Sequence, residues 1–467
     1  MQTSPDRTAP SAIPDLPRVL NTSHATAIVV GTIIGSGIFL VPQEMMRATG
    51  SSSLVYLAWI AGGLLSLFGA MTYAELSTLQ PYAGGEYVYI RGVYGDLPAF
   101  LYMWTWFAVA KPASIASVTT GLARTLAIFP ALHWLDGVAF HAGFAVLWSQ
   151  VFAIAATWLM TGLNYLGIRK AGDFQLIFTW LKGVLIVAIA VICFGSLGGH
   201  WGNFATTFVG AHGGFGGFMI ALIAALWAYD GWNDLTMVAG EVRNPGRSLP
   251  VALIAGLGIV GILYMATNAA IQYILPATQI AASPRPAVTA LQAITGPWGA
   301  ALVSIAMAVS IFVTLNGTIM SGARVPFAAA RDGLFFRRMA DVHPRFQSPS
   351  TSLIVQALLT TGLLLAVGRF QQLFELAIFA EWLFYLITAT TIFVYRRRET
   401  DEKIYHVWGY PVIPALFIAA AGVLLVYSYA ENLRNSLIGT AIILLGVPLF
   451  LVFRKQARTS AAGGSVR

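Results

Sequence analysis

The sequence predicts an all-α protein that crosses a membrane twelve times. Of its 467 residues, 57% are hydrophobic and only 10% are charged, whereas a soluble domain carries about 25% charged residues. Windows of roughly 20 apolar residues, the length that spans a bilayer, recur along almost the whole chain. They fall at residues 22–42, 52–79, 97–127, 143–166, 174–196, 214–240, 250–275, 296–323, 351–368, 372–395, 410–430 and 436–453.

The two ends of the chain differ from this apolar body. Residues 1–20 are polar and rich in proline, and they lack the apolar segment of a removable signal peptide. Residues 455–467 are rich in small and polar residues. By composition we expect both ends to be disordered tails, and we expect the first span to start membrane insertion itself.

The placement of the basic residues predicts the orientation. With the N-terminus in the cytoplasm, 20 of the 27 Lys and Arg residues fall in cytoplasmic segments, as the positive-inside rule requires. Both termini are therefore expected in the cytoplasm, and the spans in the cytoplasmic (inner) membrane. The net charge of +8 and the pI near 9.6 then reflect topology, and no nucleic-acid partner is expected.

Two spans carry residues that interrupt a membrane helix. The first contains GTIIGSGIF (Gly31–Phe39), and each glycine inside a helix costs about 1 kcal/mol relative to alanine. The sixth contains AYDG (Ala228–Gly231), with an acidic residue in mid-membrane. Glycines in one span alone also suit close helix packing. However, paired interruptions in two inverted halves indicate a secondary transporter with a binding site near the midplane.

The spacing of the interruptions divides the chain. Gly35 and Asp230 lie 195 residues apart, which is about five spans, so the two halves should have opposite orientations. We therefore expect a first five-helix repeat over 21–200, a second, inverted repeat over 201–398, and two further helices over 399–454.

A broken membrane helix makes a polar binding site, because non-helical backbone survives in the bilayer only where it lines a cavity. The half-helix after the first break directs free N–H groups and its positive dipole end at the gap, which suits a carboxylate. In the sixth span, the half ending near Tyr229 presents free carbonyl groups, which suit an ammonium group. The two breaks together predict a socket for an α-amino acid.

Several stretches of the sequence resemble one known family. GTIIGSGIF, PYAGGEYVYIRGVYG (81–95) and EVRNPGRSLP (241–250) are similar to signature segments of the amino acid–polyamine–organocation superfamily. WAYDGWN (227–233) narrows the resemblance to bacterial members of its L-type amino acid transporter branch. The resemblance implies a LeuT-like 5+5 inverted repeat with broken helices 1 and 6, followed by two extra C-terminal helices.

The resemblance also implies roles for single residues. The substrate carboxylate would meet the backbone at Gly35, Ser36 and Gly37. The substrate ammonium would meet the backbone carbonyls of Ile33, Trp227 and Asp230. The gate and the rest of the pocket are expected to involve Trp227, Tyr229, Asn233 and Asn316.

Two features depart from the family pattern. Eukaryotic members form a disulfide with a glycoprotein through a cysteine between spans three and four. The corresponding loop here (129–143) has no cysteine, and Cys193 in the fifth span is the only one in the chain. No disulfide-linked heavy-chain glycoprotein is therefore expected. The third span has Lys111 before Pro112 where the family often has arginine, and the sequence leaves open whether Lys111 faces the site.

Lys182 is the most informative single residue. A lysine inside a span is functional by default, although it could instead extend its amine to the cytoplasmic interface. By resemblance, it matches the lysine that stands where sodium binds in sodium-coupled relatives. It would then tie the fifth span to the unwound part of the first, and transport would not depend on sodium. Because an amine can lose its proton, a proton-coupled carrier is an alternative.

Three acidic residues allow different interpretations. Asp230 could bind a cationic substrate or cap the second half of the sixth span. We favour the cap, because the chain otherwise resembles carriers of neutral amino acids. Glu75 and Glu86, at the cytoplasmic end of the second span and in its loop, are expected to make gate or loop contacts.

Two further glutamates, Glu375 and Glu381, lie in the tenth span. An acidic side chain in a span is expected to face the protein interior. They could pair with each other, with Lys182 or with Arg369, and the sequence does not choose among these. It also leaves open whether Glu381 faces the site.

These features predict a secondary active transporter of L-amino acids. Sodium-independent exchange of neutral amino acids by alternating access is the favoured function; a proton-coupled symporter or a carrier of cationic amino acids or polyamines is the alternative. The chain has no HExxH motif, no Cys–His cluster and no GxxxxGK[ST] motif, which argues against an enzyme or an ATP-driven pump. No cofactor or metal is expected, and the partners are the amino acid substrate and membrane lipid.

Overall fold

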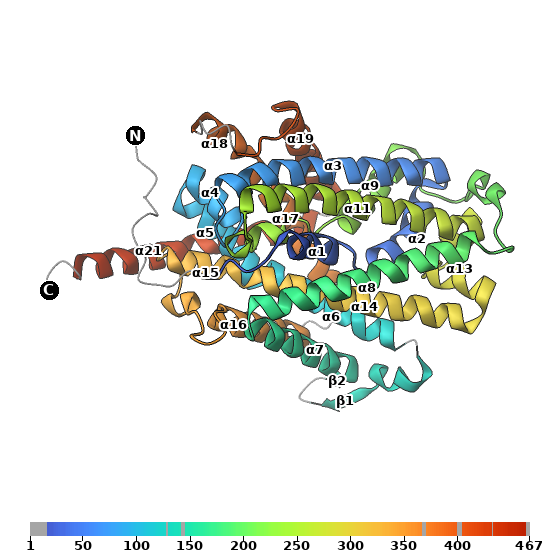
Figure 1. Cartoon of the computed structure of the whole chain (residues 1–467), viewed down its shortest axis with the longest axis horizontal. Helices are drawn as coiled ribbons and strands as arrows, with labels where there is room; N and C mark the ends of the chain where they lie inside the picture. The colour runs from blue at the N-terminus through green and yellow to red at the C-terminus, as the bar shows by residue number, and fades with distance from the viewer. Residues whose placement is uncertain are drawn as a thin grey trace.

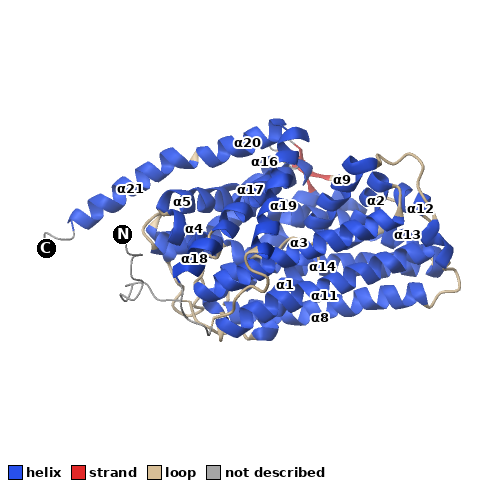
Figure 2. Ribbon diagram, turned by 90° about the horizontal axis from the view of Figure 1, so that it is seen from above, coloured by secondary structure: helices blue, strands red, loops and turns tan. Residues whose placement is uncertain are grey.

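The computed structural model describes residues 16–127, 129–141, 145–366, 370–398, 404–431 and 433–463. Long helices lie side by side along one axis of the molecule (Figures 1 and 2). At one edge, β1 (Val138–His141) pairs with β2 (Ala145–Leu147) as an antiparallel hairpin. Buried apolar side chains fill the space between the helices.

The helices follow one another with short connections. In the first half they are α1 (Thr22–Ile33), α2 (Gly37–Thr49), α3 (Ser52–Leu79), α4 (Glu86–Tyr94), α5 (Asp96–Thr105), η1 (Trp106–Ala110), α6 (Lys111–Leu126), η2 (Pro130–Asp136), α7 (Trp148–Tyr165), α8 (Ile168–Phe194) and η3 (Trp201–Ala205). In the second half they are α9 (Gly214–Ala228), α10 (Asp234–Met237), η4 (Ala239–Glu241), α11 (Pro245–Ile274), α12 (Ala277–Ala282), α13 (Pro286–Thr295), α14 (Pro297–Gly322), α15 (Arg324–Arg331), η5 (Arg337–Ala340), α16 (Ser350–Ala366), α17 (Phe370–Thr390), α18 (Ile392–Arg398), α19 (Val412–Glu431), α20 (Leu433–Leu444) and α21 (Gly446–Gly463).

Several of these helices can cross a bilayer. Within the described residues, six helical segments are long and apolar enough, and the bent pair α1–α2 makes a seventh. Two shorter apolar helices are α9 and α16. The chain is therefore a multi-pass membrane protein. The count of twelve spans and the inverted repeat stay predictions.

Both predicted helix breaks are present. The axes of α1 and α2 differ by 41° across a break at residues 34–36. In the sixth predicted span, α9 ends at Ala228 and α10 begins at Asp234. Gly231 lies in this second break with φ of 104°, a backbone conformation that glycine adopts without steric penalty. Helix α1 packs against α8, α11 and α14, and α2 packs against α9.

The third predicted span contains a local change of helix type. Pro112 cannot donate a backbone hydrogen bond, and its ring crowds the preceding turn. The five residues of η1, directly before Lys111, form a π-helical turn in which the Lys111 N–H bonds to Trp106 O. Such π-turns widen a helix locally and are frequent at functional sites.

Three predicted boundaries differ from the structure. Residues 16–20 are ordered rather than a free tail, because the N–H groups of Val19 and Leu20 both donate to Glu241 O at 3.0 Å. At the other end, α21 continues to Gly463 and so includes most of the predicted C-terminal tail. The fourth predicted span begins at residue 143, but residues 145–147 are a strand paired with β1, and helix starts only at Trp148.

Candidate functional site

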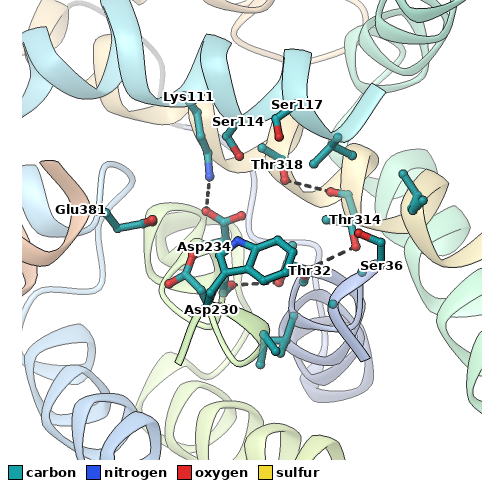
Figure 3. A pocket seen from close by; sticks show the side chains of 18 of the residues that line it. Thr32, Ser36, Lys111, Ser114, Ser117, Asp230, Asp234, Thr314, Thr318 and Glu381 are labelled. Carbon is teal, nitrogen blue, oxygen red and sulfur yellow. Dashed lines mark hydrogen bonds and ion pairs between the residues drawn. The ribbon is translucent and has the colours of Figure 1, made fainter. Parts of the chain in front are cut away.

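One cavity lies at both helix breaks. Its volume is about 130 Å³, several times the roughly 10–15 Å³ that one water molecule requires. The α1–α2 break, the α9–α10 break, η1 with α6, α14 and α17 each contribute to its wall (Figure 3). The residues that line it are Thr32, Ile33, Gly35, Ser36, Gly37, Trp106, Ala110, Lys111, Ser114, Ser117, Val118, Gly121, Trp227, Ala228, Asp230, Gly231, Asn233, Asp234, Ile311, Thr314, Thr318 and Glu381.

The first break presents backbone N–H groups to this cavity. Gly35, Ser36 and Gly37 line it, and α2 begins at Gly37 without a side-chain cap. The first N–H groups of a helix have no partner within the helix, and the helix dipole adds positive potential there. Gly37 also permits close approach to α9, because a Cβ on it would lie 3.3 Å from the Cα of Ala228. This end of the cavity therefore suits a carboxylate.

The carbonyl groups predicted to hold an ammonium are partly occupied. All three predicted residues line the cavity. However, Ile33 O accepts a hydrogen bond from the Gly35 N–H at 2.8 Å, and the Tyr264 hydroxyl lies 3.1 Å from it. That hydroxyl also lies 2.7 Å from Ala228 O, so Tyr264 joins the end of α1 to the end of α9. The single hydrogen of this hydroxyl is directed to Ala228 O by the shorter contact. An ammonium group at Ile33 O would therefore share that oxygen with the Gly35 N–H.

Trp227 and Asn233 line the cavity, whereas Tyr229 does not. The Tyr229 side chain is 2% exposed and packs against Trp59 and Tyr264, with ring centroids 5.7 Å and 5.1 Å away. The turn after α9 directs this ring toward α3 and α11 and away from the cavity. The prediction that Tyr229 is a pocket residue is therefore wrong.

Asn316 also lies away from the cavity. Its amide nitrogen donates to Gln175 Oε1 at 2.7 Å and to Ala171 O at 3.1 Å. Its Oδ1 accepts from Asn164 at 2.8 Å. These contacts tie α14 to α8 and α7, because the Asn316 side chain points toward those helices. Its predicted place in the pocket is wrong, and its role is to hold three helices together.

Lys182 crosses from α8 to the broken α1. Its side chain is fully buried, and its amine donates to Gly31 O and Ile34 O, each at 2.7 Å. The predicted tie between the fifth span and the unwound part of the first is confirmed. The alternative, an amine that extends to the cytoplasmic interface, is wrong. The side chains of Glu375 and Arg369, the other partners considered for Lys182, lie outside the part of the chain whose side chains are described.

Lys111 faces the cavity, a point that the sequence left open. Its amine forms an ion pair with Asp234 (Figure 3), and the two side chains are 6% and 3% exposed. The amine also lies 4.8 Å from the centre of the Trp106 ring. Lys111 is the one basic side chain among the described residues that line the cavity, and Asp234 neutralises it.

Asp230 and Glu381 line the same cavity. The Tyr385 hydroxyl lies 2.7 Å from Asp230 Oδ1 and 3.3 Å from Glu381 Oε1. Asn233, rather than Asp230, occupies the N-cap position of α10, and no side chain caps that helix. The predicted cap by Asp230 is therefore wrong, because the break carries its carboxylate toward α17.

The two glutamates near the cytoplasmic end differ in depth. Glu75 accepts a hydrogen bond from the Val407 N–H at 2.6 Å, so its predicted loop contact is confirmed. Glu86 is fully buried, and its Oε1 accepts from the Tyr73 hydroxyl at 2.8 Å and from Asn233 at 3.4 Å. Through its contact with Asn233, which lines the cavity, Glu86 supports the cavity wall from the protein interior. This contact could not be predicted from the sequence, because it arises where the segment after α3 folds back into the protein.

Known proteins that are similar to this chain are amino acid permeases and transporters. Residues 20–452 match the family model for amino acid permeases. The chain is 33% identical to the serine/threonine exchanger SteT of Bacillus subtilis, over 94% of this chain and 98% of that protein. It is 31% identical to the human b(0,+)-type amino acid transporter 1, over 83% of this chain and 78% of that one. It is also 30% identical to the human cystine/glutamate transporter, over 95% of this chain and 87% of that one. All of these relatives are transporters rather than enzymes.

Proposed function

This chain belongs to the amino acid permease family, and from that membership we propose that it exchanges neutral L-amino acids across the cytoplasmic (inner) membrane without sodium. The observation that carries the proposal is the cavity that both helix breaks line. Such a cavity offers N–H groups and carbonyl groups within one small space, as the two charged groups of an amino acid require.

The substrate would lie between the two breaks. Its carboxylate would bind the N–H groups of Gly35, Ser36 and Gly37, where the α2 dipole favours negative charge. The Gly35 N–H would leave Ile33 O, to which it donates at 2.8 Å, when it binds the carboxylate. Its ammonium group would bind the carbonyl groups of Ile33, Trp227 and Asp230. The ammonium group would then lie beside the Tyr264 hydroxyl, which is 3.1 Å from Ile33 O and connects α11 to the end of α1.

The side chain of the substrate would face α6 and α14. Ser114, Ser117 and Thr318 line that part of the cavity (Figure 3), and Ser117 is 5% exposed. Hydroxyl groups at this wall suit a small side chain that can exchange hydrogen bonds with them. Because a relative over almost the whole length is a serine/threonine exchanger, small hydroxylated amino acids are the proposed substrates.

Lys182 would make sodium unnecessary. Its amine holds two carbonyl oxygens of the broken α1, and carbonyl oxygens are also ligands that a sodium ion accepts. The ammonium group of Lys182 would therefore supply the positive charge that a bound sodium ion would otherwise provide. Substrate exchange would then proceed by rocking of the α1–α2, α3, α9–α10 and α11 segments against the remaining helices.

The test is uptake of labelled amino acids by proteoliposomes in sodium-free buffer. Vesicles preloaded with unlabelled serine should take up labelled serine, and empty vesicles should not. Uptake that requires sodium would contradict the role of Lys182. Uptake that is equal in empty and preloaded vesicles would contradict exchange.

A carrier of cationic amino acids is the second candidate. The observation that favours it is the excess of carboxyl groups in the cavity, where Asp230 and Glu381 line the wall and Lys111 is already paired with Asp234. If Asp230 binds a cationic side chain, wild type should exchange arginine, and Asp230→Asn should abolish arginine exchange while serine exchange remains. If the substrates are neutral only, wild type should not exchange arginine.

The proposed topology places both termini in the cytoplasm, because basic residues concentrate on that side. Cys193 is buried in α8. The carrier is therefore proposed to act without a disulfide-linked glycoprotein.

A further inference from the structure

Two carboxyl groups share one hydroxyl group in the wall of the cavity. Asp230 comes from the α9–α10 break and Glu381 from α17, and both line the cavity. The Tyr385 hydroxyl is 2.7 Å from Asp230 Oδ1 and 3.3 Å from Glu381 Oε1. The Tyr385 side chain is 1% exposed, so water does not compete freely for these contacts.

This arrangement has a place for an additional proton. A tyrosine hydroxyl has one hydrogen to donate, and an ionised carboxylate can only accept. Tyr385 can therefore donate to one of the two groups. The shorter contact is with Asp230, so the contact with Glu381 becomes a hydrogen bond only if Glu381 is protonated and donates to the tyrosine oxygen.

The charged groups around Glu381 also favour its protonated form. Two carboxylates close together in a low-dielectric site do not both ionise. From α6, Lys111 faces this region, but Asp234 of α10 already neutralises it. From α4, the buried Glu86 carboxyl also repels a charge on Glu381 when it is ionised itself. Among the described residues, no Lys, Arg or His forms an ion pair with Asp230 or Glu381.

Two neighbouring features indicate that this wall is completed by a ligand. Asn233 lines the same cavity, is 1% exposed, and its Oδ1 has no hydrogen-bond partner among the described residues. A second cavity of about 20 Å³ shares Trp227, Asp230 and Glu381 with the main one. It has room for one water molecule, which could pass a proton to or from Glu381.

We propose that Glu381 is a proton-binding site of the carrier, and that this proton must be bound for a neutral amino acid to be exchanged. The proposal rests on the proposed exchange function. With the proton bound, the Asp230–Tyr385–Glu381 group carries one negative charge. Without it, the group carries two beside a neutral substrate, and closing the cavity around them is unfavourable.

The test is the pH dependence of serine exchange in proteoliposomes with equal pH on both sides. Wild-type exchange should fall about tenfold per pH unit once the pH exceeds the point at which Glu381 loses its proton. Glu381→Gln cannot ionise but keeps a hydrogen-bond donor, so its rate of serine exchange should not fall as the pH rises. Glu44→Gln, an exposed carboxyl in α2, should keep the wild-type profile. A profile that is unchanged in Glu381→Gln would overturn the proposal.

An infrared measurement covers the case in which Glu381→Gln does not transport. Purified wild-type protein at neutral pH should show the carbonyl stretching band of a protonated carboxyl group. Glu381→Gln should lose the component of this band that Glu381 contributes, and Glu44→Gln should retain it. Identical spectra of wild type and Glu381→Gln would overturn the proposal. Absence of serine exchange by wild type at every pH would instead contradict the proposed function. The infrared comparison would still test whether Glu381 is protonated, because it does not depend on transport.

Discussion

At the scale of single residues, Lys182 links the chemistry of the site to its mechanics. Its amine makes two hydrogen bonds to the carbonyl groups that the break in α1 leaves free. A hydrogen bond from a charged group contributes about 1.5–3 kcal/mol. The residue therefore stabilises a non-helical stretch of backbone that a bilayer would otherwise penalise.

Replacing Lys182 with methionine should reduce serine exchange at least tenfold. Methionine fills similar space but removes the charged donor from Gly31 O and Ile34 O, which keep only the hydroxyl contacts of Thr314 and Ser310. Each lost hydrogen bond from a charged group contributes about 1.5–3 kcal/mol. The measurement is the initial rate of exchange per amount of reconstituted protein. Lys170→Met, at an exposed position of the same helix α8, is the control. Wild-type exchange by Lys182→Met would contradict the role given to this residue.

Ser117 should influence which amino acid is preferred. In Ser117→Ala the cavity keeps its shape but loses one hydroxyl, which contributes about 0.5–1.5 kcal/mol when it bonds to a substrate. The preference for serine over alanine should therefore fall about two- to tenfold, as competition against labelled serine measures. Thr125→Ala changes a hydroxyl of α6 that bonds to Gly121 O in its own helix, and it should leave the preference unchanged. An unaltered preference in Ser117→Ala would place the substrate side chain elsewhere.

At the scale of elements, the two breaks hold the site in place through contacts between helices. The end of α1 is fixed by Lys182 from α8, by Tyr264 from α11 and by Ser310 from α14, whose hydroxyl donates to Ile34 O at 2.7 Å. The Thr32 hydroxyl lies 2.6 Å from Ile28 O of its own helix and 2.9 Å from Gly231 O, so the last turn of α1 contacts the α9–α10 break. Movement of one broken helix therefore requires coordinated change in the other.

Gly231 should be intolerant of a side chain. Its φ of 104° disfavours any residue with a Cβ, and a Cβ there would lie 3.3 Å from the Thr32 carbonyl carbon. Gly231→Ala should lower stability by about 1–2 kcal/mol, seen as a lower midpoint of thermal unfolding in detergent. Gly362→Ala, in α16 with open space around it, should instead raise stability by up to about 1 kcal/mol. Equal effects of the two substitutions would show that the backbone at Gly231 is not constrained.

At the scale of the whole molecule, a buried ion pair joins distant segments near the ordered N-terminal residues. Arg324 of α15 contacts both carboxylate oxygens of Glu241, at 2.8 Å and 3.2 Å, and both side chains are fully buried. The backbone oxygen of Glu241 receives the N–H groups of Val19 and Leu20. One residue thus anchors the N-terminal segment, the end of the α9–α10 region and α15.

Breaking this pair should destabilise the protein as a whole. Glu241→Gln leaves a buried guanidinium group without its counter-charge, which costs about 3–5 kcal/mol. Thermal unfolding in detergent should show a large fall in the midpoint, and the double variant Glu241→Gln with Arg324→Met should recover part of it. Asp96→Asn removes one partner of Arg91 in an exposed pair and should cost less than about 1 kcal/mol. A loss in Glu241→Gln no greater than in Asp96→Asn would contradict the anchoring role.

What the sequence by itself determined was local. Apolar runs, paucity of charge and glycines beside an aspartate are properties of short windows, so they predicted a multi-pass helical protein with breaks at Gly35 and near Asp230. The tertiary structure alone decided which side chains share the cavity. Lys111 and Glu381 face it, and Tyr229 and Asn316 do not, because that depends on the rotation of each helix about its axis and on the neighbour it packs against. Tyr264 was beyond prediction for the same reason, since it reaches both breaks from a third helix.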